Sequence, residues 1–359
     1  MLGRHARDMA MDKPAAFQPP RWLTNRHAQT LFTSSPLCRP PAPRWRQETV
    51  ELPDGDFVEA HWLDPAVARP TTTLVLLHGL EGSSEATYAR MMAPAAAARG
   101  WRLVVLHARD CGERRNRLPR RYHAGETGDL RYFMGRLVGQ PDGRFIAAGY
   151  SLGGNVLLKY LGEEGADSPF AAAAAVSVPF ELQDSAEALN RGFSRFYRWY
   201  LLRRMKSAMK RKFTPDTAPF DWQAALGARD FVAFDDIVTA PLHGFRDATH
   251  YYEECSSGRY LGGIRTPTLI LNARDDPFMS PAVIPDAASL PEPVRLEITD
   301  AGGHIGFVNG TAPWRPSYWM PARLLTWFDR ALAERDSRTG PDRSSPRARH
   351  QGAGTKGPD

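Results

Sequence analysis

The sequence is poor in cysteine, and this limits the sites that it can form. Of its 359 residues only Cys38, Cys111 and Cys255 are cysteines. They lie far apart and form no C-x-x-C pair, so we expect neither a disulfide framework nor a zinc site. The pattern predicts reduced, structural cysteines and no bound metal.

Long hydrophobic runs are missing too. No stretch approaches the roughly 18 to 20 apolar residues that cross a bilayer, and no apolar stretch of signal-peptide length follows the charged N-terminus. The hydrophobic share of 42% and the charged share of 24% are ordinary for globular proteins. We therefore expect a cytoplasmic protein with a sizeable core.

Net positive charge is confined to one segment. Residues 191–213 hold nine Lys or Arg and no Asp or Glu, and removing these nine from the net charge of +6 leaves −3 for the rest. A general nucleic-acid-binding surface is therefore not expected, and one short basic helix without a reading motif does not predict one.

The arrangement of apolar runs predicts an α/β fold. Two alternating segments, 47–52 and 57–63, flank a turn and predict an antiparallel hairpin at the sheet edge. Short continuous apolar runs predict buried parallel strands separated by helices. The six expected strands are 73–77, 102–107, 144–148, 171–178, 268–271 and 294–298, and the intervening helices are 85–99, 125–138 and 152–163.

The alternation stops for about 80 residues and then resumes. We interpret this helical, aromatic and basic gap as a cap inserted after the sixth strand of the chain, counting the two strands of the hairpin. The ends contain no large apolar residues to bury and are expected to be tails. The predicted organisation is a flexible tail at 1–16, core at 17–182, helical cap at 183–263, core at 264–335 and a disordered tail at 336–359.

Ser151 follows a predicted strand and precedes a predicted helix. It lies in Gly149-Tyr150-Ser151-Leu152-Gly153, and a strained strand-to-helix turn of this kind exposes a nucleophilic serine while leaving no room for side chains at the two outer glycines. The plain alternative is a glycine-rich turn without chemistry. The context favours a nucleophile.

A nucleophilic serine needs a base and an acid, which follow it in the order acid, then histidine. Asp276 stands after the strand at 268–271, and His304 lies between glycines after the strand at 294–298. Asp275 competes for the acid role, but Asp276 is the residue followed by proline and is preferred. Each residue alone could be a turn or capping residue, whereas the three together predict a triad.

The oxyanion of an acyl-transfer reaction needs two backbone N–H donors. The residue after the serine, Leu152, offers one, and Leu80 in the loop after the strand at 73–77 is the other candidate. His78, which directly leaves that buried strand, is interpreted as structural because His304 already occupies the base position.

These residues together resemble a known family, the YheT-like esterases of the α/β-hydrolase superfamily, which are related to ABHD-type lipases. The resemblance runs from Phe17 to about Arg335. The chain is similar to the family in the segments 25–31, 116–118, 122–127, 149–155, 192–195, 234–236, 243–245, 275–278 and 302–307.

The resemblance implies an α/β-hydrolase fold with Ser151, Asp276 and His304 as the charge-relay residues. One segment departs from the family pattern. Where such proteins usually have Arg-Gly-Cys-Ser-Gly, this chain has Arg109-Asp110-Cys111-Gly112-Glu113, with acids at two positions that favour small residues. The shape of that loop and the substrate preference are the properties affected.

The basic segment 191–213 is predicted to be an amphipathic helix. Its apolar residues recur at three- and four-residue steps, with a basic outer face. The plain interpretation is a helix that covers the site; the sharper one is peripheral contact with anionic membrane lipid. The apolar residues are Phe193, Phe196, Tyr197, Tyr200, Leu201, Met205, Ala208 and Met209.

The function predicted is hydrolysis of a carboxylic ester or lipid with a short or medium acyl chain, through an acyl-enzyme and without a metal or organic cofactor. Two alternatives stay open. Acyl transfer to an alcohol needs the same triad, and a catalytically silent scaffold would bind a lipid or a protein partner through the cap. The sequence does not indicate an oligomeric state.

Overall fold

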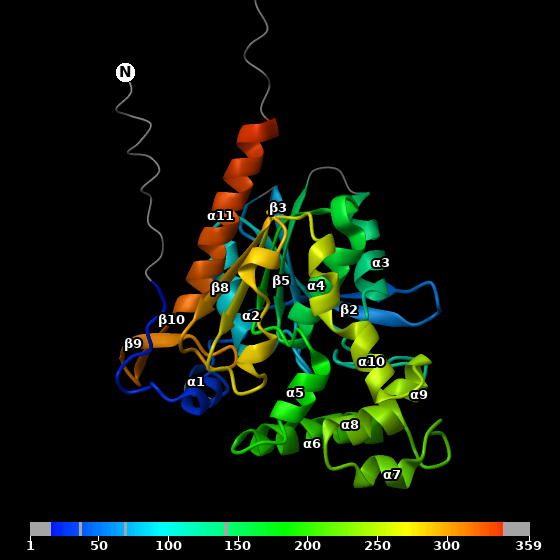
Figure 1. Cartoon of the computed structure of the whole chain (residues 1–359). Helices are drawn as coiled ribbons and strands as arrows, with labels where there is room; N and C mark the ends of the chain where they lie inside the picture. Colours follow the sequence, from blue (N-terminus) through cyan, green and yellow to red (C-terminus); the bar gives the residue numbers. More distant parts are fainter. Residues whose placement is uncertain (1–15, 36–37, 68–69, 140–142, 340–359) are drawn as a thin grey trace, which may run out of the picture.

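The central sheet has eight strands in the order β1-β2-β4-β3-β5-β6-β7-β8 (Figure 1). The computed structural model describes residues 16–35, 38–67, 70–139 and 143–339. Most of the two expected tails, 1–15 and 340–359, lies outside these residues.

An antiparallel hairpin forms one edge of the sheet, as the sequence predicts. Its two strands pair from Arg46 opposite Trp62 to Glu51 opposite Phe57. The second strand then pairs antiparallel with β4, which joins the hairpin to the parallel part. The strands concerned are β1 (Arg46–Glu51), β2 (Phe57–Leu63) and β4 (Arg102–Leu106).

All the other strand pairings in this sheet are parallel. Three of the strands, β3, β6 and β7, are buried along their whole length, which explains why they are continuous apolar runs rather than alternating ones. The parallel strands after the hairpin are β3 (Thr72–Leu77), β5 (Arg144–Tyr150), β6 (Phe170–Val176), β7 (Thr268–Ala273) and β8 (Val294–Thr299).

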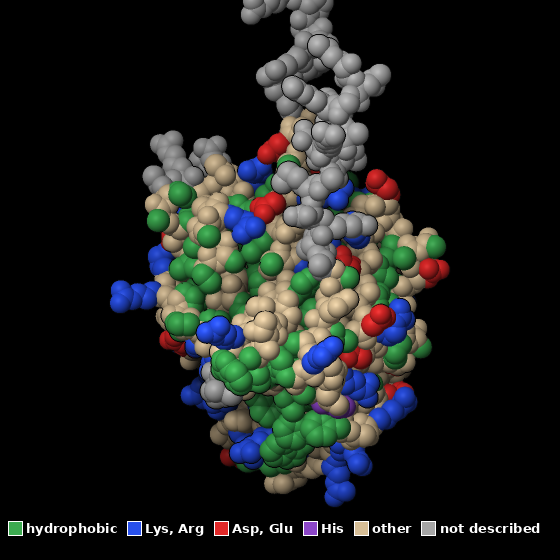
Figure 2. Space-filling model, turned by 90° about the vertical axis from the view of Figure 1, so that its left-hand side faces the viewer, with side chains coloured by type: hydrophobic (Ala, Val, Ile, Leu, Met, Phe, Trp, Pro, Cys, Tyr) green, Lys and Arg blue, Asp and Glu red, His purple; other side chains and the backbone are tan. Residues whose placement is uncertain are grey.

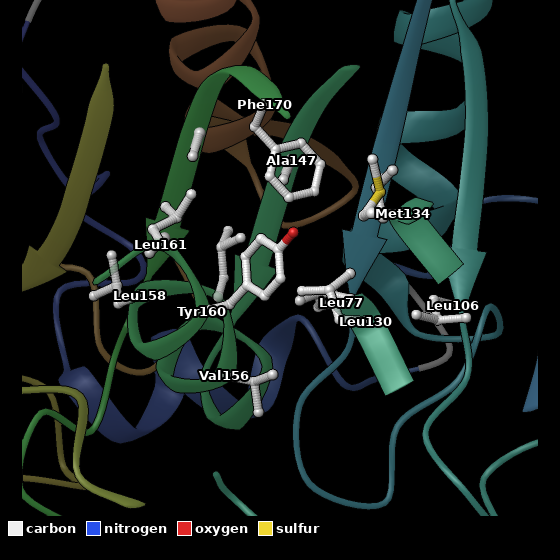
Figure 3. Packing of buried hydrophobic residues seen from close by; sticks show 14 of the residues in the cluster. Leu77, Leu106, Leu130, Met134, Ala147, Val156, Leu158, Tyr160, Leu161 and Phe170 are labelled. Atoms are coloured by element: carbon white, nitrogen blue, oxygen red, sulfur yellow. The ribbon is translucent and has the colours of Figure 1, made fainter. Parts of the chain in front are cut away.

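Helices cover both faces of the sheet. One core cluster joins α3 and α4 to the sheet, and the other joins α2 and α11 to the opposite face. Figure 3 shows the first cluster, where the Tyr160 ring of α4 meets Phe170 of β6 edge-on at 5.9 Å between ring centroids. These helices are α2 (Thr87–Ala97), α3 (Gly128–Val138), α4 (Leu152–Glu164) and α11 (Trp319–Thr339).

A helical insertion follows the sixth strand, which confirms the predicted fold class. Most of the insertion between β6 and β7 lies beyond the carboxyl ends of the parallel strands, at the lower end of the molecule in Figure 1. Its last segment runs back along α4, where Tyr260 and Gly263 lie against Gly162. The insertion contains α5 (Leu182–Ala188), α6 (Ser194–Lys212), α7 (Trp222–Gly227), α8 (Phe231–Phe234), a π-helical turn (Asp235–Thr239), α9 (Ala240–His243), α10 (Ala248–Cys255) and a 3-10 segment (Ser257–Gly263).

The apolar residues of α6 do not form the single buried face that their spacing suggests. Tyr197, Met205, Ala208 and Met209 are buried, but three aromatic members of the predicted stripe are exposed. They are exposed because one side of the helix packs inward, whereas the other borders an open space beside α1 (Arg26–Phe32), whose His27 ring lies 4.7 Å from that of Phe193. The exposed members are Phe193, Phe196 and Tyr200.

Three other details differ from the sequence-based expectation. Two 3-10 turns follow β7, where prolines interrupt the segment and prevent a longer helix. A small second sheet follows β8, and the last helix continues to Thr339, past the predicted limit of 335. The elements are the 3-10 turns Pro281–Val283 and Ala287–Ser289, and strands β9 (Val308–Ala312) and β10 (Arg315–Tyr318).

Candidate active site

Ser151 lies between β5 and α4 in a strained backbone conformation, with φ 53° and ψ −121°. The turn depends on two glycines. A Cβ on Gly149 would lie 2.4 Å from the carbonyl oxygen of Gly153, and a Cβ on Gly153 would lie 2.5 Å from the carbonyl oxygen of His78. These positions accept no side chain, so the turn has the steric character that a nucleophile elbow requires.

Three side chains that are distant in the sequence meet at this turn. His304 Nε2 lies 2.9 Å from Ser151 Oγ, and His304 Nδ1 lies 2.9 Å from Asp276 Oδ2. Asp276 and His304 are buried, whereas Ser151 is half-buried. The structure therefore joins the predicted nucleophile, base and acid in one hydrogen-bonded chain.

Asp275, the competing acid, has a different contact. Its Oδ1 accepts a hydrogen bond from the Gly303 N–H at 2.9 Å, so this carboxyl supports the loop that carries His304. Asp276 reaches the imidazole itself and also accepts the Phe278 N–H at 2.8 Å. The geometry separates the two neighbouring carboxyls into a loop support and an imidazole partner.

The histidine loop is held by two hydroxyls that the sequence alone did not single out. Thr30 Oγ1 accepts the His304 N–H at 2.9 Å, and Ser177 Oγ accepts the Ile305 N–H at 3.0 Å. Thr30 belongs to α1 (Arg26–Phe32), inside the segment 25–31 that supports the family resemblance. That segment was the available signal, but nothing in it showed which residue would reach the loop.

The two backbone donors predicted for an oxyanion, Leu80 and Leu152, line the cavity that also contains Ser151 and His304. Leu152 is the first residue of α4, and the first N–H groups of a helix have no partner within the helix. Gly79 brings the other loop close, since a Cβ there would lie 3.3 Å from the Ser151 Cβ. Both residues therefore lie beside the serine.

The loop after β3 is held in place by buried polar groups. Glu81 has a φ of 52°, its N–H donates to the Tyr122 hydroxyl at 2.8 Å, and that hydroxyl donates to Glu81 Oε1 at 2.9 Å. Arg121 pairs with the same carboxylate at 2.9 Å. Burial raises the pKa of Tyr122 well above its ordinary value, so its hydroxyl stays a donor. Arg204 of α6 donates to the Glu81 carbonyl oxygen.

His78 has contacts that fit a structural role. Its Nδ1–H donates to the Gly79 carbonyl oxygen at 2.7 Å, and its Nε2 accepts the Ala108 N–H at 3.0 Å. Burial lowers its pKa, which favours the neutral ring that this pattern of one donor and one acceptor requires. Both ring nitrogens are occupied by the backbone.

Two chambers open on either side of Ser151. The inner chamber, of about 120 Å³, extends under the insertion, and the outer chamber, of about 580 Å³, opens towards α1 and α2. Both are lined by Leu80, Ser151, Leu201, Phe278 and His304. The inner one continues along Ala124, Leu182, Ala186, Leu189, Met205 and Phe231, and the outer one along Leu31, Arg39, Tyr88, Phe196, Tyr200 and Arg204.

The inner chamber has one buried carboxyl in its wall. Asp235 stands at the start of the π-helical turn and accepts hydrogen bonds from the Thr239 hydroxyl at 2.6 Å and the Tyr252 hydroxyl at 2.7 Å. Burial raises the pKa of Asp235 to about 6 despite these two donors. The rest of the wall is mainly apolar, apart from Ser151, His304 and a few further polar side chains.

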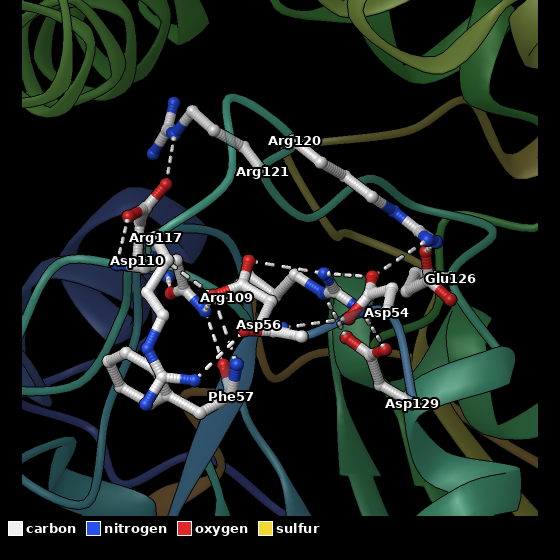
Figure 4. Close-up of polar contacts among 12 residues, drawn as sticks. Asp54, Asp56, Phe57, Arg109, Asp110, Arg117, Arg120, Arg121, Glu126 and Asp129 are labelled. Carbon is white, nitrogen blue, oxygen red and sulfur yellow. Dashed lines mark hydrogen bonds and ion pairs between the residues drawn. The ribbon is translucent and has the colours of Figure 1, made fainter. Parts of the chain in front are cut away.

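The loop that departs from the family pattern is tied to its surroundings by its acids. Asp110 has a φ of 65°, and its Oδ2 lies 2.7 Å from the Lys212 Nζ at the end of α6. Figure 4 shows Arg121 reaching the same carboxyl, at 3.4 Å. Glu113 accepts a hydrogen bond from Gln47 at 2.6 Å. Asp110 therefore links this loop to the basic helix of the insertion.

Among the described residues there is no group of three His, Cys, Asp or Glu side chains suited to hold a metal ion. In the same part of the chain, no helix has both the length and the apolar character that a membrane span requires.

A family model described as the alpha/beta hydrolase fold matches residues 72–311. YheT of Escherichia coli (strain K12), which carries the name of an esterase, is 42% identical over 322 residues, covering 88% of this chain and 93% of that protein. Phospholipase ABHD3 of Mus musculus is 31% identical over 329 residues, covering 89% and 79%.

Similarity to solved structures extends over the same region. The esterase Pf2001 of Pyrococcus furiosus superposes with a TM-score of 0.52 over 87% of this chain and 99% of that one, at 16% identity. At that identity the likeness supports the fold alone.

Proposed function

This chain belongs to the α/β-hydrolase family as a YheT-like member, and on that premise we propose that it hydrolyses carboxylic esters with Ser151 as nucleophile. The hydrogen-bonded chain from Ser151 Oγ through His304 to the buried Asp276 carries the proposal. Because Ser151 occupies a strained turn above the sheet, its Oγ faces a cavity rather than the core.

In the proposed reaction Ser151 Oγ attacks the ester carbonyl while His304 Nε2 takes the serine proton. Asp276 accepts from the Nδ1–H, which selects the tautomer with a free Nε2 and stabilises the imidazolium that forms. The N–H groups of Leu80 and Leu152 would hold the oxyanion. His304 then gives the proton to the leaving alcohol as the ester C–O bond breaks, and the acyl group stays on Ser151. Water, activated by His304, then hydrolyses this acyl-enzyme and releases the acid.

The two chambers suggest where the acyl part and the alcohol part of an ester would bind. The inner chamber is narrow and largely apolar, which suits a short or medium acyl chain. The outer chamber is larger and has Arg39 and Arg204 in its wall, which suits the alcohol part of the ester or lipid. In this arrangement the insertion, residues 183–263, acts as a cap that forms the acyl site.

A fluorophosphonate probe tests the nucleophile directly. We expect the folded wild-type chain to be labelled, and the Ser151→Ala variant to fold and remain unlabelled. Ser177, a buried serine that supports the histidine loop, gives a matched control, because Ser177→Ala should retain labelling. Absence of labelling in well-folded wild type would favour the catalytically silent scaffold instead.

The width of the outer chamber also keeps acyl transfer to an alcohol as a second candidate, because a site that releases an alcohol also admits one. Adding ethanol to the hydrolysis of a medium-chain ester separates the two. A transferase would form the ethyl ester in preference to the free acid, and a hydrolase would form mainly the acid.

A further inference from the structure

The outward side of α6, together with Phe193 directly before it, carries large aromatic side chains that stay largely exposed, although the His27 ring of α1 lies 4.7 Å from that of Phe193. Phe193, Phe196, Trp199 and Tyr200 are 51%, 43%, 53% and 46% exposed. Leu31 of α1, which lines the outer chamber together with Phe196 and Tyr200, is 37% exposed. We call these five side chains the aromatic rim.

Three rings of the rim are contiguous. The ring centroids of Phe193 and Phe196 lie 5.7 Å apart, and those of Phe196 and Trp199 lie 6.0 Å apart. Figure 2 shows a gathering of hydrophobic side chains at the lower end of one face, with Lys and Arg around it. Contiguous apolar surface of this kind marks an interaction site rather than a chance exposure.

The rim surrounds the way into the site. Leu31, Phe196 and Tyr200 line the same outer chamber as Ser151 and His304. A molecule that covers the rim therefore also faces the chamber. This position favours an occupant that itself contains the substrate. An occupant without substrate would block the chamber.

The charge on α6 is of one sign, and the one acidic side chain among the described residues that line the outer chamber, Glu85, is paired with Arg39 and Arg90. The helix α6 contains eight Lys or Arg and no acidic residue. Arg203 lies over the Trp199 ring with its guanidinium carbon 5.6 Å from the ring centroid. Within the described ranges neither Arg195 nor Arg203, both exposed, forms an ion pair with a carboxylate, so their charge is available to a partner.

We propose that the aromatic rim docks on an anionic phospholipid surface and presents the outer chamber to esters held in that surface. Aromatic rings, Trp above all, settle at the boundary between headgroups and acyl chains, and the flanking cations are attracted to anionic headgroups. Delivery of an ester to Ser151 rests on the proposed function, whereas docking does not.

The test uses the full chain and vesicles of phosphatidylcholine, with or without phosphatidylglycerol. The variant is Phe193→Ser with Trp199→Ser, because these two side chains line neither chamber. The matched control is Val67→Ser with Val138→Ser, two exposed apolar side chains outside the rim, which are 48% and 52% exposed.

We expect the wild-type chain and the control to co-float with the anionic vesicles, and the rim variant to bind at least ~10-fold more weakly, since interfacial binding scales with buried apolar area. Fluorophosphonate labelling and hydrolysis of a water-soluble ester should be equal in all three. Hydrolysis of an ester carried in the vesicles should fall in the rim variant alone.

Two results would overturn docking: no flotation of the wild type, or equal flotation of the rim variant. Sedimentation that shows a wild-type dimer, lost in the rim variant, without vesicle binding would identify the rim as a contact between copies of the chain. If vesicles bind the wild type but no ester is hydrolysed and no probe attaches, the proposed function fails while docking stands.

Discussion

The Phe278 ring lies flat on the His304 imidazole, with ring centroids 3.9 Å apart and an angle of 2° between the planes. Phe278 also lines both chambers, so the same ring orients the base and touches the space for substrate. Neither role is visible in the sequence, where Phe278 is only the residue after Asp276-Pro277.

Replacing Phe278 by Leu should lower kcat by ~10-fold or more, because the imidazole loses the surface that fixes its plane and small misplacements at a reacting centre are costly. Phe278→Tyr keeps the stacked ring and should restore most of the rate. The measurement is kcat and KM on a soluble ester. A change confined to KM would show that Phe278 contacts substrate without orienting His304.

The two neighbouring carboxyls should differ sharply. Asp276→Asn should reduce kcat by roughly 10³- to 10⁴-fold, since the amide selects the wrong imidazole tautomer. Asp275→Asn keeps an oxygen to accept the Gly303 N–H and should stay within about tenfold of wild type. Steady-state rates of both variants on one ester test this difference. Equal losses in both variants would contradict the assignment of Asp276 as the imidazole partner.

The glycine at the end of the elbow should accept no methyl group. Gly153→Ala places a Cβ 2.5 Å from the carbonyl oxygens of His78 and Leu77, so we expect a loss of about 2 kcal/mol or more in the free energy of unfolding, together with loss of probe labelling. Gly135→Ala, in α3 with no atom within 4 Å of the new Cβ, is the control. It should be neutral or stabilising by up to ~1 kcal/mol. Urea unfolding measures both.

Arg109 holds together two carboxylates at the hairpin turn and one in the first turn of α3. Its guanidinium lies 2.7 Å from Asp54, 3.2 Å from Asp56 and 2.7 Å from Asp129, and it is 2% exposed (Figure 4).

Arg109→Met should therefore destabilise the fold by ~3–5 kcal/mol, because buried carboxylates lose their counter-charge. Arg330→Met, which breaks an exposed pair on α11, should cost less than ~1 kcal/mol. Urea unfolding compares the two variants, and a similar small loss in both would show that the buried cluster is not needed for stability.

The buried carboxyl of the inner chamber should make stability depend on pH. The pKa of Asp235 is raised from 3.8 to about 6, so the folded chain holds this proton more tightly than the unfolded chain. Its contribution to the free energy of unfolding is therefore most favourable below about pH 4. That contribution, on the order of 2 kcal/mol, is lost as the pH rises through about 6.

Asp235→Asn removes this titration. The difference in unfolding free energy between variant and wild type should shift in favour of the variant from pH 4 to pH 7, on the order of the same 2 kcal/mol. Asp236→Asn, at the exposed neighbouring position, controls for the substitution itself. A difference that does not vary with pH would show that Asp235 does not titrate in this range.

The strands and their burial were predictable because each strand is a continuous local pattern in the sequence. Thr72–Leu77 and Thr268–Ala273 are buried over their full length, and buried parallel strands must be continuously apolar. The boundaries were less well predicted. The helix expected from 85 begins at Thr87, and the last helix runs past 335 to Thr339, because tertiary packing overrides the average composition of a window.

The sequence by itself determined the elbow at Ser151, since only glycine fits beside so sharp a turn, and it placed Asp276 and His304 after successive strands whose ends meet at one edge of a parallel sheet. Tertiary structure alone decided which hydroxyls support His304, which ring covers it, and which side of α6 faces water. Helical spacing tells which residues share a side, but not which side a neighbouring element will cover. For that reason Phe196 and Tyr200, spaced as core residues, lie at the mouth of the site.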